Sequence, residues 1–153
     1  MTDSDDLLKL ENQLCFALVT AARNVVAIYR PILEPLGLTH PQYLVMLALW
    51  ERSPRTLNDL AAELALDPAT ASPLVKRLEK EGLIARERSS EDERRLDIRL
   101  TPSGQQLRQR ALDVPHQVMA AVHMDIQQVA TLRDGLSPFA GRAPIGEMRA
   151  ERG

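Results

Sequence analysis

The sequence predicts a mainly helical fold with a small β-hairpin wing, that is, a winged helix-turn-helix between N- and C-terminal helices. Three observations predict this class. An amphipathic helix follows Asp67, a shorter capped helix follows Thr56 just upstream, and two segments that alternate apolar and polar residues follow over 83–88 and 96–101. Helix, tight connection, helix and hairpin in this order are typical of a DNA-binding unit.

Asp67 and Pro68 mark the start of the second of these helices. The aspartate side chain can accept hydrogen bonds from the free amides of the first turn, and proline at the first helical position loses no hydrogen bond. At 100° per residue, the apolar side consists of Ala71, Leu74, Val75 and Leu78, and the polar side of Thr70, Ser72, Lys76, Arg77 and Lys80. A polar face of this kind is by itself typical of a solvated helix, so the neighbouring segments decide the interpretation.

The neighbouring segments favour DNA binding. Upstream, Thr56 and Asp59 have the Thr-x-x-Asp form of a helix start, and a tight connection leads from that short helix into Asp67. Downstream, the hairpin tip at 89–95 is rich in charged residues. From Pro68 to Arg110, ten Lys or Arg stand against seven Asp or Glu, whereas the whole chain has a net charge of −2. Positive charge is therefore concentrated on the expected DNA face.

The rest of the chain is also predicted to be helical. Apolar residues at three- and four-residue steps from Leu7 to Tyr29 predict a long first helix that ends near Pro31 or Pro35, with Gly37 closing the segment.

Three further helices are expected after this point. The residues from Thr39 to Gln42 have the form of a capping box and open a helix that continues through Trp50. Thr101 opens another helix, which Pro115 should kink or break, and a final helix is expected over about 119–133.

One domain is expected for a chain of 153 residues, and we place it at 1–133. Its DNA-binding core is expected over about 53–101, between outer helices at about 5–34 and 102–133. Glycine and proline residues recur after Asp134, so 134–153 is predicted to be a frayed or disordered tail.

Composition and motifs argue against other classes. The longest uninterrupted apolar run, Tyr43 to Trp50, has eight residues and is too short to cross a membrane, and the N-terminus is acidic. We therefore expect a cytoplasmic protein without a membrane partner. His40, His116 and His123 lie far from Cys15 in the sequence, and no phosphate loop or catalytic triad is present, so we expect no metal, no cofactor and no enzymatic activity.

The hairpin carries a motif that is found in one family of regulators. The chain resembles the MarR transcriptional regulators, whose wing motif is represented here by Asp92, Arg94, Ile98, Leu100 and Thr101. The segments 10–18 and 29–44 make the likeness closer to the organic-hydroperoxide-sensing OhrR branch of that family. The matching segments together cover about residues 7–115.

The resemblance implies a homodimeric repressor, held together by the dimerisation helices at about 5–34 and 102–133, on a pseudo-palindromic operator of double-stranded DNA. The DNA-binding residues are then expected to be Thr70, Ser72, Lys76 and Arg77 on the helix and Arg86, Asp92, Arg94 and Arg95 on the hairpin. We expect the helix to enter the major groove and Arg94 to enter the minor groove beside an A·T-rich flank.

The resemblance also implies that Cys15, the single cysteine, senses oxidants. In OhrR-like proteins the matching cysteine is a thiolate held by tyrosine hydroxyls, and organic hydroperoxides oxidise it to a sulfenic acid, which releases the DNA. Tyr29 is fourteen residues away, about 21 Å along a helix, so it would have to act from the partner subunit. Val19 and His40 stand where relatives commonly have tyrosines. Without a second cysteine, oxidised Cys15 should form a mixed disulfide with a small thiol or overoxidise.

Two alternatives stay open from the sequence. A lone cysteine on a helix is commonly a small buried hydrophobe. The chain would then be a MarR-like repressor that senses a small aromatic ligand, with Cys15 purely structural. A thiol peroxidase is disfavoured, because no Arg or Thr stands beside Cys15 in a recognisable catalytic motif.

Overall fold

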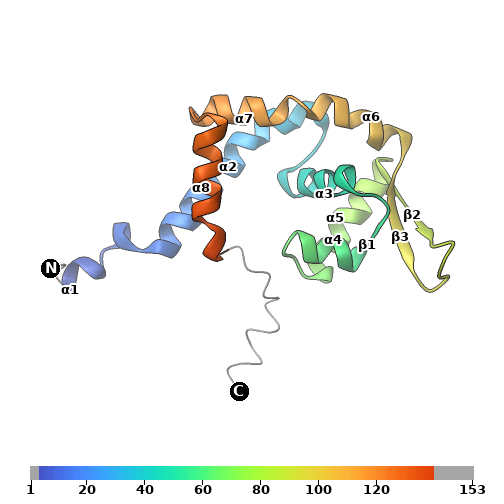
Figure 1. Cartoon of the computed structure of the whole chain (residues 1–153), viewed down its shortest axis with the longest axis horizontal. Helices are drawn as coiled ribbons and strands as arrows, with labels where there is room; N and C mark the ends of the chain where they lie inside the picture. The colour runs from blue at the N-terminus through green and yellow to red at the C-terminus, as the bar shows by residue number, and fades with distance from the viewer. Residues whose placement is uncertain (1–3, 140–153) are drawn as a thin grey trace, which may run out of the picture.

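The computed structural model describes residues 4–139, which form two connected parts (Figure 1). One part is an arm of outer helices, in which α2 packs against α7. The arm consists of α1 (Ser4–Leu7), η1 (Leu10–Asn12), α2 (Leu14–Leu33), α6 (Pro102–Ala111), α7 (Val114–Val122), α8 (Ile126–Gly135) and the short turn η3 (Ser137–Phe139). The second part is a globular unit at one end of this arm, and the hairpin projects from its edge.

The globular unit is a winged helix-turn-helix, as the sequence predicts. After the short turn η2 (Glu34–Leu36), it contains α3 (His40–Glu51), β1 (Arg55–Thr56), α4 (Leu57–Glu63), α5 (Pro68–Lys80), β2 (Ile84–Arg88) and β3 (Leu96–Leu100). The strands form an antiparallel sheet in the order β1-β3-β2, in which Ile84 pairs with Leu100 and Arg88 with Leu96. The third strand, β1, was not predicted, because two residues carry no periodicity.

The predicted helix starts are confirmed by their caps. The side chains of Thr39, Thr56, Asp67 and Thr101 each accept a hydrogen bond from the backbone N–H three residues later. Such bonds satisfy amides that have no partner within the helix, and each contributes about 1 kcal/mol to stability. These four residues therefore fix where α3, α4, α5 and α6 begin.

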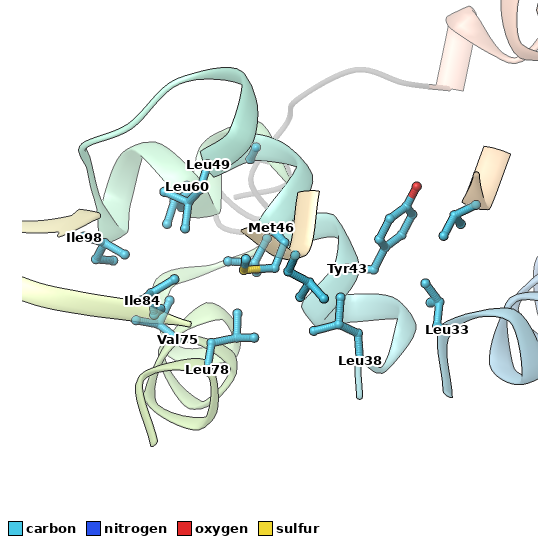
Figure 2. Packing of buried hydrophobic residues seen from close by; sticks show 14 of the residues in the cluster. Leu33, Leu38, Tyr43, Met46, Leu49, Leu60, Val75, Leu78, Ile84 and Ile98 are labelled. Carbon is cyan, nitrogen blue, oxygen red and sulfur yellow. The ribbon is translucent and has the colours of Figure 1, made fainter. Parts of the chain in front are cut away.

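The core of the globular unit lies between α3, α4, α5 and the sheet (Figure 2). Its fully buried side chains include Met46 and Leu49 of α3, Leu60 of α4, Leu78 of α5 and Ile84 of β2. The apolar stripe that the sequence predicts for α5 is the face that packs here. Burial of this stripe leaves the opposite face of α5 at the surface.

A close contact joins the arm to the globular unit. A Cβ atom on Gly104 of α6 would lie 2.1 Å from the backbone oxygen of Leu83, so only glycine allows the helix to approach this closely. The Trp50 indole N–H donates to the Gly104 carbonyl at 2.9 Å, and the Thr101 hydroxyl donates to the Gly82 carbonyl at 2.6 Å. The first turn of α6 is thereby fixed to the connection between α5 and the wing.

The prediction of one long first helix is wrong near its start. Residues 8–13 interrupt it, and α2 begins at Leu14. The Asn12 amide donates to the Asp6 carbonyl at 2.6 Å, and the Gln13 amide donates to the carbonyls of Leu7 and Lys9 at 2.8 Å. These side-chain amides donate to backbone carbonyls that would accept from backbone N–H groups in a continuous helix. Side chains of this kind thereby compete with helix formation.

The single helix predicted over 119–133 is also wrong, because it is divided in two. His123 has a left-handed backbone with φ of 55°, which ends α7. Asp125 and Gln128 then form a capping box that starts α8. The tail was predicted to be frayed or disordered from Asp134, but α8 continues to Gly135 and η3 follows it. The rest of the predicted tail, 140–153, lies outside the described residues.

The outer helices leave apolar side chains exposed within this single chain. Of the α2 residues, Leu33 alone is buried, and α8 buries none. Leu14, Phe16, Ile126 and Leu132 expose between 44% and 72% of their surface. By length and composition alone, the segment Leu14–Leu36 could span a membrane. Within this chain, only 6% of its most apolar 18-residue stretch is buried. A helix that packs against a second subunit has the same features, since large exposed apolar patches mark interaction surfaces.

Candidate DNA-binding surface and redox site

The exposed face of α5 carries the side chains predicted to bind DNA. Thr70, Lys76 and Arg77 are exposed, and Ser72 is half-buried. Asp67 fixes the first turn, because its carboxylate accepts from the Thr70 backbone N–H at 2.8 Å and from the Thr70 hydroxyl at 3.1 Å. These side chains project from a rigid helix that is packed on the core through its other face.

The wing tip holds its backbone with its own side chains. The Asp92 carboxylate accepts from the backbone N–H of Arg94 at 3.0 Å. The Arg88 guanidinium donates to the Glu93 carbonyl at 2.7 Å, and Arg95 pairs with Asp97 at 2.9 Å. Within residues 4–139, by contrast, the Arg94 guanidinium makes no hydrogen bond or ion pair. Arg94 is therefore presented at the tip with its charge available to a partner.

Arg86 is placed differently from the tip residues. Its guanidinium donates two hydrogen bonds to the Glu79 carboxylate of α5, at 3.0 and 3.1 Å. The hydrogen bond from Arg86 lowers the pKa of Glu79, so the carboxylate stays ionised at neutral pH. Sequence reasoning placed Arg86 among the DNA-binding residues and did not foresee this pair.

Cys15 is exposed in the first turn of α2. Val19, one turn later, is 40% exposed and offers no hydrogen-bond donor. Cys15 and Tyr29 lie on the same continuous helix, fourteen residues apart, so the distance between them within one chain is about 21 Å.

Tyr29 belongs to an aromatic cluster, formed with His40 and Tyr43 of α3. The ring centre of Tyr29 lies 4.8 Å from that of His40 and 5.9 Å from that of Tyr43. Burial raises the pKa of both tyrosines, so their hydroxyls remain protonated and can donate at neutral pH. Sequence reasoning singled out Tyr29 and His40 but did not place Tyr43 beside them.

His40 should make stability depend on pH. Burial lowers the pKa of His40 below its usual value of 6.5. The unfolded chain therefore takes up the proton first as the pH falls, which favours unfolding. We expect the free energy of unfolding to decrease as the pH falls through about 6.5 and below, and His40→Gln to reduce this decrease. Urea unfolding at several pH values between about 7.5 and 5 measures this pH dependence. The control is His116→Gln, because His116 is exposed. An unchanged slope in His40→Gln would contradict the assignment.

A cavity of about 440 Å³ lies where the arm meets the globular unit. Its wall includes Arg30 of α2, Glu34 of η2, His40 of α3, Arg77 of α5 and Glu81 just after α5. The helix that carries Cys15 and the candidate DNA-binding helix α5 therefore both border this cavity. Among the described residues, no group of three His, Cys, Asp or Glu side chains is placed to hold a metal ion.

The fold and this surface define a winged-helix DNA-binding transcriptional regulator. The model of the MarR family matches residues 38–96. The chain is 40% identical to the organic hydroperoxide resistance transcriptional regulator of Bacillus subtilis over 136 residues, which is 89% of this chain and 92% of that protein. The chain belongs to the MarR family, whose members bind DNA and are not enzymes, so the thiol peroxidase alternative no longer applies.

Solved structures agree with this assignment. The fold is similar to that of reduced AbfR bound to DNA, a protein of Staphylococcus epidermidis, with a TM-score of 0.65, 39% identity and coverage of 73% of this chain and 78% of that one. It is also similar to CouR of Rhodococcus jostii RHA1, with a TM-score of 0.70, 28% identity and coverage of 87% of this chain and 95% of that one.

Proposed function

We propose that the chain is a dimeric, cytoplasmic repressor that leaves its operator when an organic hydroperoxide oxidises Cys15. The observation that carries the proposal is the position of Cys15, which is exposed in the first turn of α2. The relative in Bacillus subtilis, 40% identical, is a regulator of organic hydroperoxide resistance.

Dimerisation would cover the exposed apolar faces of the arm. The side chains that lose contact with water would include Leu14, Phe16, Ile126 and Leu132. Burial of apolar surface contributes about 25 cal/mol per Å², which is the main favourable term in subunit association. The same burial accounts for the apolar composition of α2 without a membrane partner.

The dimer would place two copies of α5 on one side of the DNA. Each α5 enters the major groove with Thr70, Ser72, Lys76 and Arg77 at phosphates and base edges. Asp92 keeps the wing tip in shape, and Arg94 and Arg95 reach the adjacent minor groove. Two-fold symmetry then requires a pseudo-palindromic operator with half-sites about 10 bp, or a multiple of this, apart.

The redox step would begin at the Cys15 thiolate. Its sulfur attacks the terminal oxygen of the hydroperoxide, the O–O bond breaks, and an alcohol leaves after it takes up a proton; the sulfur becomes a sulfenic acid. A small cellular thiol then condenses with the sulfenic acid, which forms a mixed disulfide and releases water. Because the chain contains one cysteine, an internal disulfide cannot form. The added group would sit on α2 at the subunit interface and change how the two arms pack.

The test is Cys15→Ser in operator-binding measurements. We expect the reduced wild type and the variant to bind the operator equally, because serine is nearly isosteric with cysteine. An organic hydroperoxide with a small thiol should weaken wild-type binding at least tenfold, which corresponds to 1.4 kcal/mol or more, and leave the variant unchanged. A reductant should restore the wild type. If the variant is released by hydroperoxide as the wild type is, the proposal fails.

A second candidate is a repressor that senses a small aromatic ligand, with Cys15 structural. The cavity between α2, α3 and α5 favours it, because Arg30, His40 and Arg77 border it and could hold a carboxylate. The similar structure CouR was solved bound to p-coumaroyl-CoA. In this case aromatic acids should release Cys15→Ser from DNA, and hydroperoxide should release neither form.

A further inference from the structure

One ion pair links the wing to α5. Glu79 lies in the last turns of α5 and Arg86 in the middle of β2, and two hydrogen bonds join their side chains. A bidentate pair of this kind fixes direction as well as distance, because the planar guanidinium must face the carboxylate. About a third of each side chain is exposed.

The other charged pairs of the hairpin stay within it. Arg99 pairs with Glu87, and Arg95 with Asp97. Among the described residues, Glu79–Arg86 is thus the ion pair that joins the hairpin to the helix that faces DNA.

The pair lies where the hydrophobic core ends. Arg86 pairs with Ile98 across the ladder, so its side chain is on the same face of the sheet as the buried Ile84 and Ile98. Further toward the tip, the hairpin has no buried side chain, and Leu96 is 43% exposed. Apolar packing therefore fixes the base of the wing, and the Glu79–Arg86 pair ties the wing to α5 at the point where this packing ends.

We propose that the Glu79–Arg86 pair sets the angle of the wing against α5, so that Arg94 reaches the minor groove when α5 occupies the major groove. Arg86 is then a positioning residue and not a phosphate ligand. The inference rests on the proposed DNA-binding mode of the wing. Because exposed ion pairs contribute little to folding stability, variants of this pair should fold, and thermal unfolding would verify it.

The variant Glu79→Gln distinguishes a phosphate contact of Arg86 from a positioning role, because the two predict changes of operator affinity in opposite directions. If Arg86 contacts a phosphate, this variant frees the guanidinium and removes a negative charge near DNA, so operator affinity should rise or stay the same. If the pair positions the wing, the affinity should fall, by about five- to tenfold, and Arg86→Gln should lower it by a similar factor. The matched control is Glu87→Gln, which removes the same charge but breaks a pair that lies within the hairpin, on the strand that carries Arg86.

A double-mutant cycle with Arg94→Ala completes the experiment, since coupled residues give non-additive effects. We expect Arg94→Ala to lower the affinity at least tenfold in the wild type and less than threefold in Glu79→Gln. Full additivity, or a Glu79→Gln affinity no lower than that of Glu87→Gln, would overturn the positioning role while leaving the wing on DNA. If Arg94→Ala had no effect even in the wild type, the proposed binding mode of the wing would fail, and the inference with it.

Discussion

Arg94→Ala should weaken operator binding about 10- to 100-fold, as expected when a contact of about 1–3 kcal/mol is removed. The reason is the construction of the wing tip. The Asp92 carboxylate accepts a hydrogen bond from the backbone N–H of residue 94. Alanine at this position keeps the same N–H, so the turn at the wing tip should keep its conformation. The guanidinium makes no bond within residues 4–139, so its removal should leave the folded chain intact. The loss should therefore appear in DNA affinity and not in stability.

Fluorescence anisotropy with a labelled operator at physiological salt measures this loss. Arg108→Ala is the matched control, because it removes an equal charge from the exposed surface of α6. The effect of Arg94→Ala should shrink when the operator flank is changed from A·T-rich to G·C-rich, since a narrow minor groove attracts arginine most strongly. Equal losses for Arg94→Ala and Arg108→Ala would mean that only total charge matters at the wing.

The parts of the fold that the sequence predicts are those with local causes. Thr39, Thr56, Asp67 and Thr101 each satisfy a free amide only three residues away, so each helix start can be recognised in the sequence. The buried stripe of α5 follows in the same way from the spacing of its apolar residues.

The errors arose where a local signal was overridden or overlooked. Apolar spacing from Leu7 onward suggested one helix, but Asn12 and Gln13 take over backbone carbonyls and end it. The break between α7 and α8 has a visible signal, the capping pair Asp125 and Gln128, which the continuous periodicity obscured.

The candidate site shows the limit of sequence reasoning more clearly. The hairpin register decides that Arg86 faces α5, and this register depends on how the whole sheet packs. Likewise, Tyr43 joins Tyr29 and His40 only because the turn at Gly37 folds α3 back along α2. Types and spacing of residues identified the candidates, while the tertiary fold determined which of them meet.

Tyr29→Phe should slow the oxidation of Cys15 by about 10- to 100-fold, because a hydrogen bond to a charged group contributes about 1.5–3 kcal/mol. Burial keeps the Tyr29 hydroxyl protonated and able to donate to a thiolate. Within one chain the two residues are about 21 Å apart along α2, so we expect the donor to come from the partner subunit. DNA binding by the reduced variant should be unchanged, because the phenyl ring can still pack against His40 and Tyr43.

Heterodimers decide whether Tyr29 acts between subunits. When a Cys15→Ser subunit is paired with a Tyr29→Phe subunit, the single remaining cysteine faces the intact tyrosine of its partner. It should react with an organic hydroperoxide at the wild-type rate, measured by labelling of the free thiol. The matched control pairs a wild-type subunit with one that carries both substitutions, so that the same single cysteine faces phenylalanine and should react slowly. If the two heterodimers show the reverse order, Tyr29 acts within its own chain, and if both react at the wild-type rate, Tyr29 has no part in activating Cys15.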